Sequence, residues 1–224
     1  MEWDAIRLSL VLAGWTLAIL LPAGIALARW LATARFTGRH WVEGLLALPL
    51  VLPPTVLGYY LLVAMGGTSA VGRWFQAATG TTLAFSFTGL VLASLLFNLP
   101  FAVQPIQRAI EAIDPDVREA ALCCGMTSWQ TLLRIELPLA WPGVLSAAVL
   151  TFAHTLGEFG VVLMVGGNIP GETRTVALAI YDRAQSFDAG AAGSMSLLLL
   201  VVSFLTIAVS YGLGNRLPGT RRRR

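Results

Sequence analysis

The 224-residue sequence contains no lysine, only two cysteines and two histidines, and 12% charged residues. An ordinary soluble domain has roughly 25% charged residues, so this chain lacks the polar surface that a protein in water needs. Without lysine it has no Gly-x-x-x-x-Gly-Lys-Ser/Thr loop, which excludes a nucleotide-hydrolysing module of that kind. The adjacent Cys123 and Cys124 lie far along the chain from His40 and His154, so the sequence assembles no zinc ligand set.

Apolar residues are abundant: 56% of the chain is hydrophobic and the mean hydropathy is +0.73. A helix that crosses a bilayer needs about 20 mainly apolar residues. Such windows run over residues 8–28, 45–65, 83–104, 137–165 and 191–213. The sequence therefore predicts an all-α integral membrane protein with about five transmembrane helices, forming a single domain over residues 1–224.

Prolines within the second window predict that this span is kinked. They stand at Pro49, Pro53 and Pro54. If this region splits into two short segments, the number of spans becomes six, although the distribution of charge then fits less well.

The arginines predict the orientation, because short cytoplasmic loops have an excess of positive charge. They gather after the first span, between the third and fourth, and after the last: Arg29, Arg35, Arg39, Arg108, Arg118, Arg134, Arg216 and Arg221 to Arg224. We therefore expect the N-terminus outside and the C-terminus inside. The arginine-rich tail is expected to contact anionic lipid rather than nucleic acid.

One alternative for the first span is a cleaved signal peptide, because Ala26-Leu27-Ala28 has the small-x-small form of a cleavage site. A signal peptide begins with a positively charged region. Here Glu2 and Asp4 outweigh Arg7, which favours a membrane span that stays in the protein.

Residues 111–137 form the least hydrophobic long stretch, and they contain start and stop signals for short helices. The Asp-Pro step at Asp114 is typical of a helix start. Gly125 predicts a left-handed turn that ends this helix, and Thr127 or Ser128 can cap a second one. Periodicity alone leaves an ordinary linker as an equal alternative.

The same segment, with the one residue that follows it, contains a fixed set of residues: Glu119, Ala120, Ala121, Gly125, Ile135, Leu137 and Pro138. Their types and spacing resemble the EAA signature of bacterial ABC importer permeases at every defining position. The resemblance implies that residues 111–137 are a cytoplasmic coupling segment, which docks into a cleft on a separate ATPase subunit. Small side chains at 120 and 121 would let the partner's backbone approach closely, and Glu119 would offer it a charged anchor. These are docking features, and no residue of this chain is expected to be catalytic.

Polar residues within spans are costly and often mark a transport pathway. The third and fourth windows contain Asn98, Thr151, His154, Thr155 and Glu158. Three of them, Thr151, Thr155 and Glu158, share one helix face, and His154 can reach Glu158 one turn later. We expect these residues to line or gate a translocation path, with hydrogen bonding between helices as the alternative. A carboxylate repels an anion, so Glu158 is expected to brace a loop or gate rather than touch the cargo.

Residues 154–160, His-Thr-Leu-Gly-Glu-Phe-Gly, and the loop at 166–171, Gly-Gly-Asn-Ile-Pro-Gly, resemble the molybdate permease family. Sulfate permeases share a related Leu-Gly-Glu-Phe-Gly element. The resemblance implies a type I ABC importer permease fold in the bacterial inner membrane, and a cargo of molybdate or tungstate, with sulfate or thiosulfate as the alternative.

The resemblance also implies the partners. Two copies of the chain would form the pore, two cytoplasmic ABC ATPase subunits would bind ATP and Mg²⁺, and an extracytoplasmic binding protein would deliver the oxyanion. This chain is then expected to hold no cofactor and no metal. An intramembrane hydrolase built on His154 is a weaker alternative, because the chain has no Gly-x-Ser-x-Gly element. An ATP-independent channel or carrier would not need Glu119.

Overall fold

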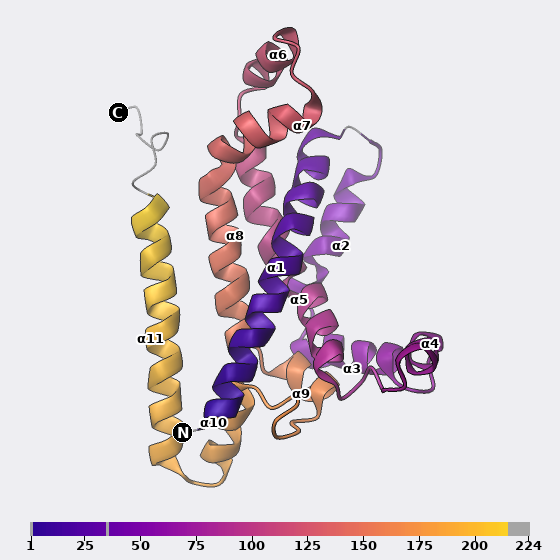
Figure 1. The fold of residues 1–224 in the computed structure, drawn as a ribbon, viewed down its shortest axis with the longest axis vertical. Coiled ribbons are helices and arrows are strands. Elements are labelled where there is room, and N and C mark those ends of the chain that lie inside the picture. Colours follow the sequence, from indigo (N-terminus) through magenta and orange to yellow (C-terminus); the bar gives the residue numbers. More distant parts are fainter. Residues whose placement is uncertain (1, 35, 215–224) are drawn as a thin grey trace.

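The computed structural model of the chain describes residues 2–34 and 36–214, and in these residues the regular structure is helical (Figure 1). The helices are α1 (Trp3–Thr33), α2 (Arg39–Val51), α3 (Pro54–Met65), α4 (Ala70–Thr79), α5 (Phe87–Glu111), α6 (Pro115–Cys123), α7 (Ser128–Thr131), a π-helical segment (Leu132–Glu136), α8 (Leu137–Gly157), α9 (Gly160–Gly166), α10 (Val176–Gln185) and α11 (Ala189–Gly214). Arg216 and Arg221 to Arg224, which contribute to the predicted orientation, lie outside the described residues.

Four of these helical stretches are long and apolar enough to cross a membrane, and the α2–α3 pair makes a fifth if it counts as one span. The four are α1, α5, the continuous helix from α7 through α8, and α11. The predicted all-α membrane fold with about five spans is confirmed.

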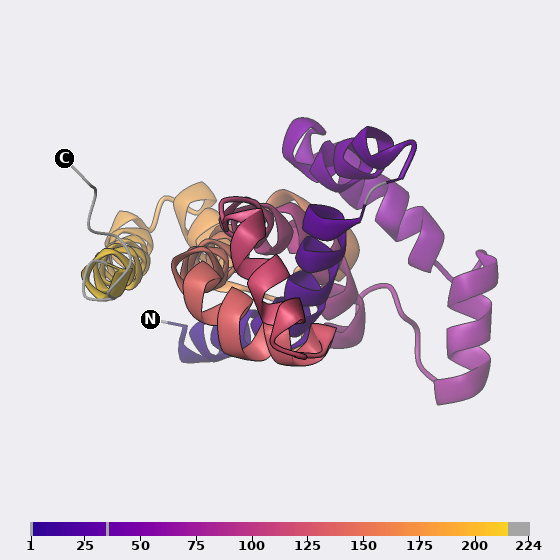
Figure 2. The same ribbon diagram turned by 90° about the horizontal axis from the view of Figure 1, so that it is seen from above.

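Helices α1, α5 and α8 pack against one another at the centre of the bundle, with α2 to α4 on one side and α11 on the other (Figures 1 and 2). Small residues bring these helices together. A Cβ atom added to Gly24 of α1 would lie 3.3 Å from the Cβ of Ala102 in α5. One added to Gly143 of α8 would lie 2.6 Å from the carbonyl oxygen of Pro105. The core nearest α6 is therefore tightly packed, with Leu31, Val103, Ile106, Ile110 and Val144 buried in it.

The kink predicted for the second span is in fact a bend of 108° between α2 and α3. Pro53 and Pro54 have no N–H groups, and Leu52 before them is extended (φ −71°, ψ 137°), so the helix cannot continue. With 13 and 12 residues, the two helices span about 20 and 18 Å at 1.5 Å per residue. The kinked span expected over 45–65 is thus corrected to two helices, each shorter than the roughly 30 Å hydrocarbon core.

The fourth predicted span, 137–165, is wrong at both ends. Helix α8 stops at Gly157, Glu158 is extended (φ −68°, ψ 126°), and α9 begins at Gly160 as a separate short helix. At the other end the chain is already helical from Ser128. Pro138 therefore does not stand at a true helix start. In the π-helical turn before it, the Leu137 N–H donates to the Leu132 carbonyl, five residues back instead of four. The proline therefore follows a turn in which the helical hydrogen bonds are already shifted by one residue.

The third span was predicted over 83–104, but the helix observed there, α5, covers Phe87–Glu111 and so begins and ends later in the chain. Ser86 accepts a hydrogen bond from the Gly89 N–H at 3.1 Å and caps the start of the helix. Leu83 and Ala84, expected inside the span, instead lie buried in the preceding loop.

Candidate functional site

Helices α6 and α7 project beyond the bundle at one end of the molecule, whereas the N-terminus, α9 and α10 lie at the other end (Figure 1). We call residues 115–131 the tip. The Asp114 side chain accepts a hydrogen bond from the Asp116 N–H at 3.1 Å, and Gly125 is left-handed with φ +76°. The Gly125 N–H donates to the Leu122 carbonyl and the Met126 N–H to that of Ala121. The predicted start and glycine stop of this helix are confirmed.

Thr127 begins the second helix of the tip. Its hydroxyl accepts from the Gln130 N–H at 3.3 Å, while the Gln130 side chain accepts from the Thr127 N–H at 2.9 Å. This reciprocal pair is a capping box. The second helix was expected to be short, but it continues through the π-helical segment into α8, so the tip is joined directly to a membrane span.

The signature residues divide into an exposed and a packed set. Glu119, Ala120, Gly125 and Pro138 are exposed, Ile135 and Leu137 are half-buried, and Ala121 is buried. Sequence reasoning missed the large apolar side chains that accompany the exposed set, above all Leu122 and Trp129, which is 64% exposed. A tryptophan within a mainly polar segment was the available signal. Leu133 and Trp141, with Leu137 and Pro138, line an adjacent groove of about 340 Å³.

Within the bundle, a chain of hydrogen bonds joins α1, α5 and α8. The Thr16 hydroxyl donates to the Ser94 Oγ at 2.9 Å, and the Asn98 amide nitrogen donates to the same oxygen at 3.1 Å. The Asn98 Oδ1 is 3.0 Å from the His154 Nδ1. An amide oxygen can only accept, so this arrangement gives His154 a proton on Nδ1. The ring stacks on Phe101 with centroids 4.1 Å apart.

The expected contact between His154 and Glu158 is not formed, and His154 pairs with Asn98 instead. Glu158 accepts a hydrogen bond from the Val161 N–H at 2.8 Å, so it holds the start of α9. Asn98, Thr151 and Thr155 are buried between helices in this conformation. Asn98 bonds to another helix through His154, the interaction expected of hydrogen bonding between helices. The Thr155 hydroxyl instead donates to the Thr151 carbonyl on its own helix at 2.7 Å, and the Thr151 hydroxyl has no hydrogen-bond partner among the described residues. His154 is half-buried. A role for these residues in a transport path stays a prediction.

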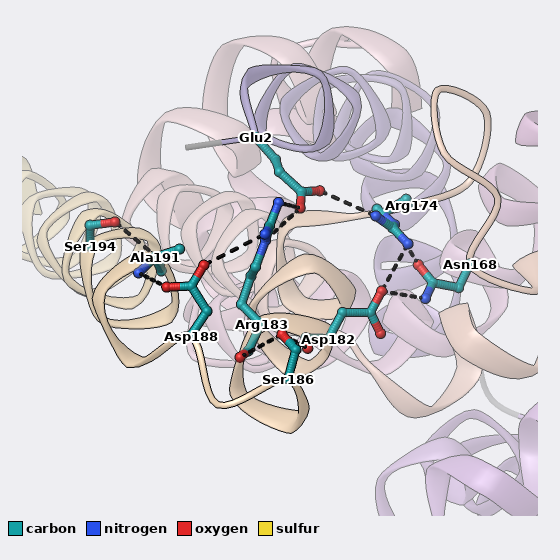
Figure 3. A network of polar contacts seen from close by, with 9 residues as sticks. All are labelled: Glu2, Asn168, Arg174, Asp182, Arg183, Ser186, Asp188, Ala191 and Ser194. Atoms are coloured by element: carbon teal, nitrogen blue, oxygen red, sulfur yellow. Dashed lines mark hydrogen bonds and ion pairs between the residues drawn. The ribbon is translucent and has the colours of Figure 1, made fainter.

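Five charged side chains at the other end tie the N-terminus to the region around α10 (Figure 3). Glu2 pairs with Arg183 at 3.0 Å and with Arg174 at 3.5 Å. Arg174 also pairs with Asp182 at 2.9 Å, and Arg183 with Asp188 at 3.5 Å. Asn168 lies within this network, where it accepts from Arg174 and donates to Asp182. The network fixes the loop after α9 against α10 and the start of α1.

Replacing Arg174 with glutamine is expected to loosen this end of the molecule. The variant loses ion pairs to Glu2 and Asp182 and its bond to Asn168, and these partners are only partly buried. The expected destabilisation is about 1–2 kcal/mol, measured by thermal unfolding in detergent at low salt. Arg73→Gln on α4 removes the same charge from the same end and should change little. Equal unfolding temperatures for the two variants would contradict the structural role of the network.

The chain matches known transport proteins over most of its length. Residues 21–218 match the family described as binding-protein-dependent transport system inner membrane component. The chain is 47% identical to the molybdenum transport system permease protein ModB of Azotobacter vinelandii over 92% of both chains. It is 38% identical to ModB of Escherichia coli K12 over 93% of this chain and 90% of that one. The sulfate transport system permease protein CysT of E. coli is 32% identical, over 82% of this chain and 66% of that one.

Solved structures show the same fold at lower identity. A bacterial ABC transporter involved in the import of the acidic polysaccharide alginate aligns with a TM-score of 0.77 at 21% identity, over 96% of this chain and 79% of that one. The MetNI methionine ABC transporter in inward-facing conformations aligns with a TM-score of 0.69 at 18% identity, over 97% and 94%. The fold is that of ABC importer permeases. With the family match over residues 21–218, the chain belongs to the inner-membrane components of binding-protein-dependent transport systems.

Proposed function

We propose that this chain is the membrane-spanning permease subunit of an ATP-driven importer for molybdate or tungstate. The observation that carries the proposal is its 47% identity to a molybdenum transport permease over 92% of both chains. The sulfate permease is less similar, at 32% identity, and is matched over only 66% of its length. Molybdate is therefore favoured over sulfate as the cargo.

The exposed tip supports a second part of the proposal, that a separate ATPase docks there. The tip projects from the bundle and presents Glu119, Ala120, Leu122 and Trp129 to its surroundings. Large exposed aromatic and aliphatic side chains, rimmed by polar ones, are typical of protein interfaces. The ATPase would bind and hydrolyse ATP with Mg²⁺, because this chain has no phosphate-binding loop of its own.

This docking site would place the tip in the cytoplasm and the N-terminus outside. The extracytoplasmic binding protein would then meet the end that contains the network of Figure 3. An open cavity of about 640 Å³ lies at this end, and Arg7, Thr82, Phe85 and Glu172 are among its lining residues. Two copies of the chain would enclose the path, and selectivity would come mainly from the binding protein.

Transport of the cargo can be tested in proteoliposomes that contain this chain, its ATPase and its binding protein. We expect uptake of labelled molybdate to need ATP, to fall when excess tungstate is added, and to resist excess sulfate. Competition by sulfate as strong as that by tungstate would move the chain to the sulfate branch. Molybdate uptake at the same rate without ATP or ATPase would contradict an ATP-driven importer.

A further inference from the structure

A buried carboxylate joins the tip to the bundle at the cytoplasmic end that the proposed function assigns. Glu136, in the π-helical segment, is 1% exposed, and each of its two oxygens has an arginine partner. The Arg118 Nε from α6 lies 2.9 Å from Oε1, and the Arg29 Nε from α1 lies 2.6 Å from Oε2. We call these three residues the Glu136 cluster.

Each arginine of the cluster also donates a second hydrogen bond to a backbone carbonyl. Arg29 donates to Ser128 O at 2.7 Å, at the start of α7. Arg118 donates to Ile110 O, near the end of α5. Charge-assisted bonds of this kind are about twice as strong as neutral ones and fix direction as well as distance. The Glu136 cluster therefore holds α1, α5, α6 and α7 in one arrangement.

Helix α6 has little else to hold it. Ala121 is its one buried residue, and Glu119, Ala120, Leu122 and Cys123 are exposed. A nine-residue helix is too short to be stable in water by itself, so its position depends on tertiary contacts. Arg118 supplies the charged contact, and Glu136 holds Arg118 in place.

The position of Glu136 on its helix connects the tip to the polar groups inside the bundle. Glu136 lies on the same face of the continuous helix as four buried residues of α8, namely Ala140, Val144, Ala147 and Thr151. A displacement of α6 would therefore be transmitted through one carboxylate both to α8 and, by way of Arg29, to α1.

We propose that Glu136, Arg118 and Arg29 are positioning residues that make the tip and the bundle move as one body when the ATPase acts. The inference rests on the proposed docking of an ATPase at the tip. Arg118 and Glu136 link α6 to α8, and Arg29 extends the link to α1. If the link is lost, the ATPase should still bind the tip and hydrolyse ATP. Its movement should then no longer reach the transport path through α8 and α1.

The attachment of α6 can be measured without any partner, by hydrogen–deuterium exchange of the full chain in lipid nanodiscs. In Arg118→Gln we expect the amides of residues 115–123 to exchange at least about tenfold faster, because α6 loses its buried charged contact. Glu136→Gln should do the same. Arg108→Gln is the matched control, since Arg108 is 82% exposed and pairs with Glu111 on its own helix.

A double variant tests whether the two residues act through each other. If they do, adding Arg118→Gln to Glu136→Gln will change the exchange of residues 115–123 by less than about twofold. If Glu136→Gln fails to fold, the comparison of Arg118→Gln with its control Arg108→Gln still tests whether Arg118 holds α6 in place. Exchange of residues 115–123 that is equal in Arg118→Gln, Arg108→Gln and the unchanged chain would overturn the inference.

The functional consequence is measured in the reconstituted importer as ATP hydrolysed per molybdate ion transported. We expect this ratio to rise at least about fivefold in Arg118→Gln, with the ATPase still bound, and to stay constant in Arg108→Gln. A constant ratio in both variants would overturn the coupling part of the inference. If the unchanged chain binds no ATPase, the proposed function fails, while the exchange result still reports on the attachment of α6.

Discussion

Replacing Gly143 with valine is expected to push α8 away from α5 and to destabilise the bundle by about 3 kcal/mol or more. A Cβ at this position would lie 2.6 Å from the carbonyl oxygen of Pro105 and would also meet the Cβ of Ala109. Neither group is the free end of a flexible side chain, so the backbones themselves would have to move apart. Overpacking a core usually costs about 1–3 kcal/mol, and we expect this variant to reach or exceed the upper end of that range.

The measurement is thermal unfolding in detergent, with size exclusion to detect aggregated chain. Gly157→Val is the matched control, because Gly157 lies on the same helix and a Cβ there would meet nothing within 4 Å. The control should change the stability by less than about 1 kcal/mol, because glycine and valine differ by less than that in helix propensity. If both variants unfold at the same temperature, the close contact of α5 and α8 is wrong.

Replacing Trp129 with alanine is expected to weaken ATPase binding about thirtyfold without changing the fold. Trp129 is 64% exposed in the tip, so its removal leaves no cavity in the core. An aromatic anchor at an interface typically contributes about 2 kcal/mol or more, which corresponds to roughly thirtyfold in the dissociation constant.

Titration of the detergent-solubilised permease with its purified ATPase measures this affinity. Trp74→Ala is the control, because Trp74 is also highly exposed but lies on α4 at the other end of the molecule. We expect the control to bind as the unchanged chain does. Weakened binding in Trp74→Ala, with unchanged binding in Trp129→Ala, would place the ATPase at the wrong end for the proposed function.

The local signals in the sequence predicted the tip well, because its geometry depends on neighbours in the chain. An Asp-Pro step starts a helix, and a glycine with φ +76° ends it, whatever surrounds them. The apolar windows likewise predicted about how many spans there are, since length and hydropathy suffice for that, but they misplaced the ends of the third and fourth.

The bend between α2 and α3 is a feature that local sequence signals predicted only in part. The prolines predicted a break, but its angle depends on where α3 packs. Gly58 of α3 lies against Met164 and Val161 of α9, more than a hundred residues later, so closely that an added Cβ would be 2.8 Å from Met164. Contacts of this kind have no signature in the sequence of either helix.

The Glu136 cluster was missed for the same reason. In sequence Glu136 is one charged residue in a mixed segment, between two positions of the signature, and it could have been exposed. Its partners stand 18 and 107 residues away, and the π-helical turn that shifts its face is not predictable from composition. The contact expected between His154 and Glu158 failed because α8 ends at Gly157: Glu158 is extended, does not continue the helix one turn beyond His154, and accepts from the Val161 N–H instead.

The most direct test of an ATP-driven permease that is coupled through its tip is molybdate uptake with and without ATP in three chains. They are the unchanged protein, Gly125→Trp, and the control Gly125→Asn, because asparagine tolerates the left-handed conformation at φ +76°. We predict ATP-dependent uptake in the unchanged chain and in Gly125→Asn, and loss of uptake in a folded Gly125→Trp whose bulk blocks docking. Uptake that needs no ATP and persists in Gly125→Trp would contradict the account.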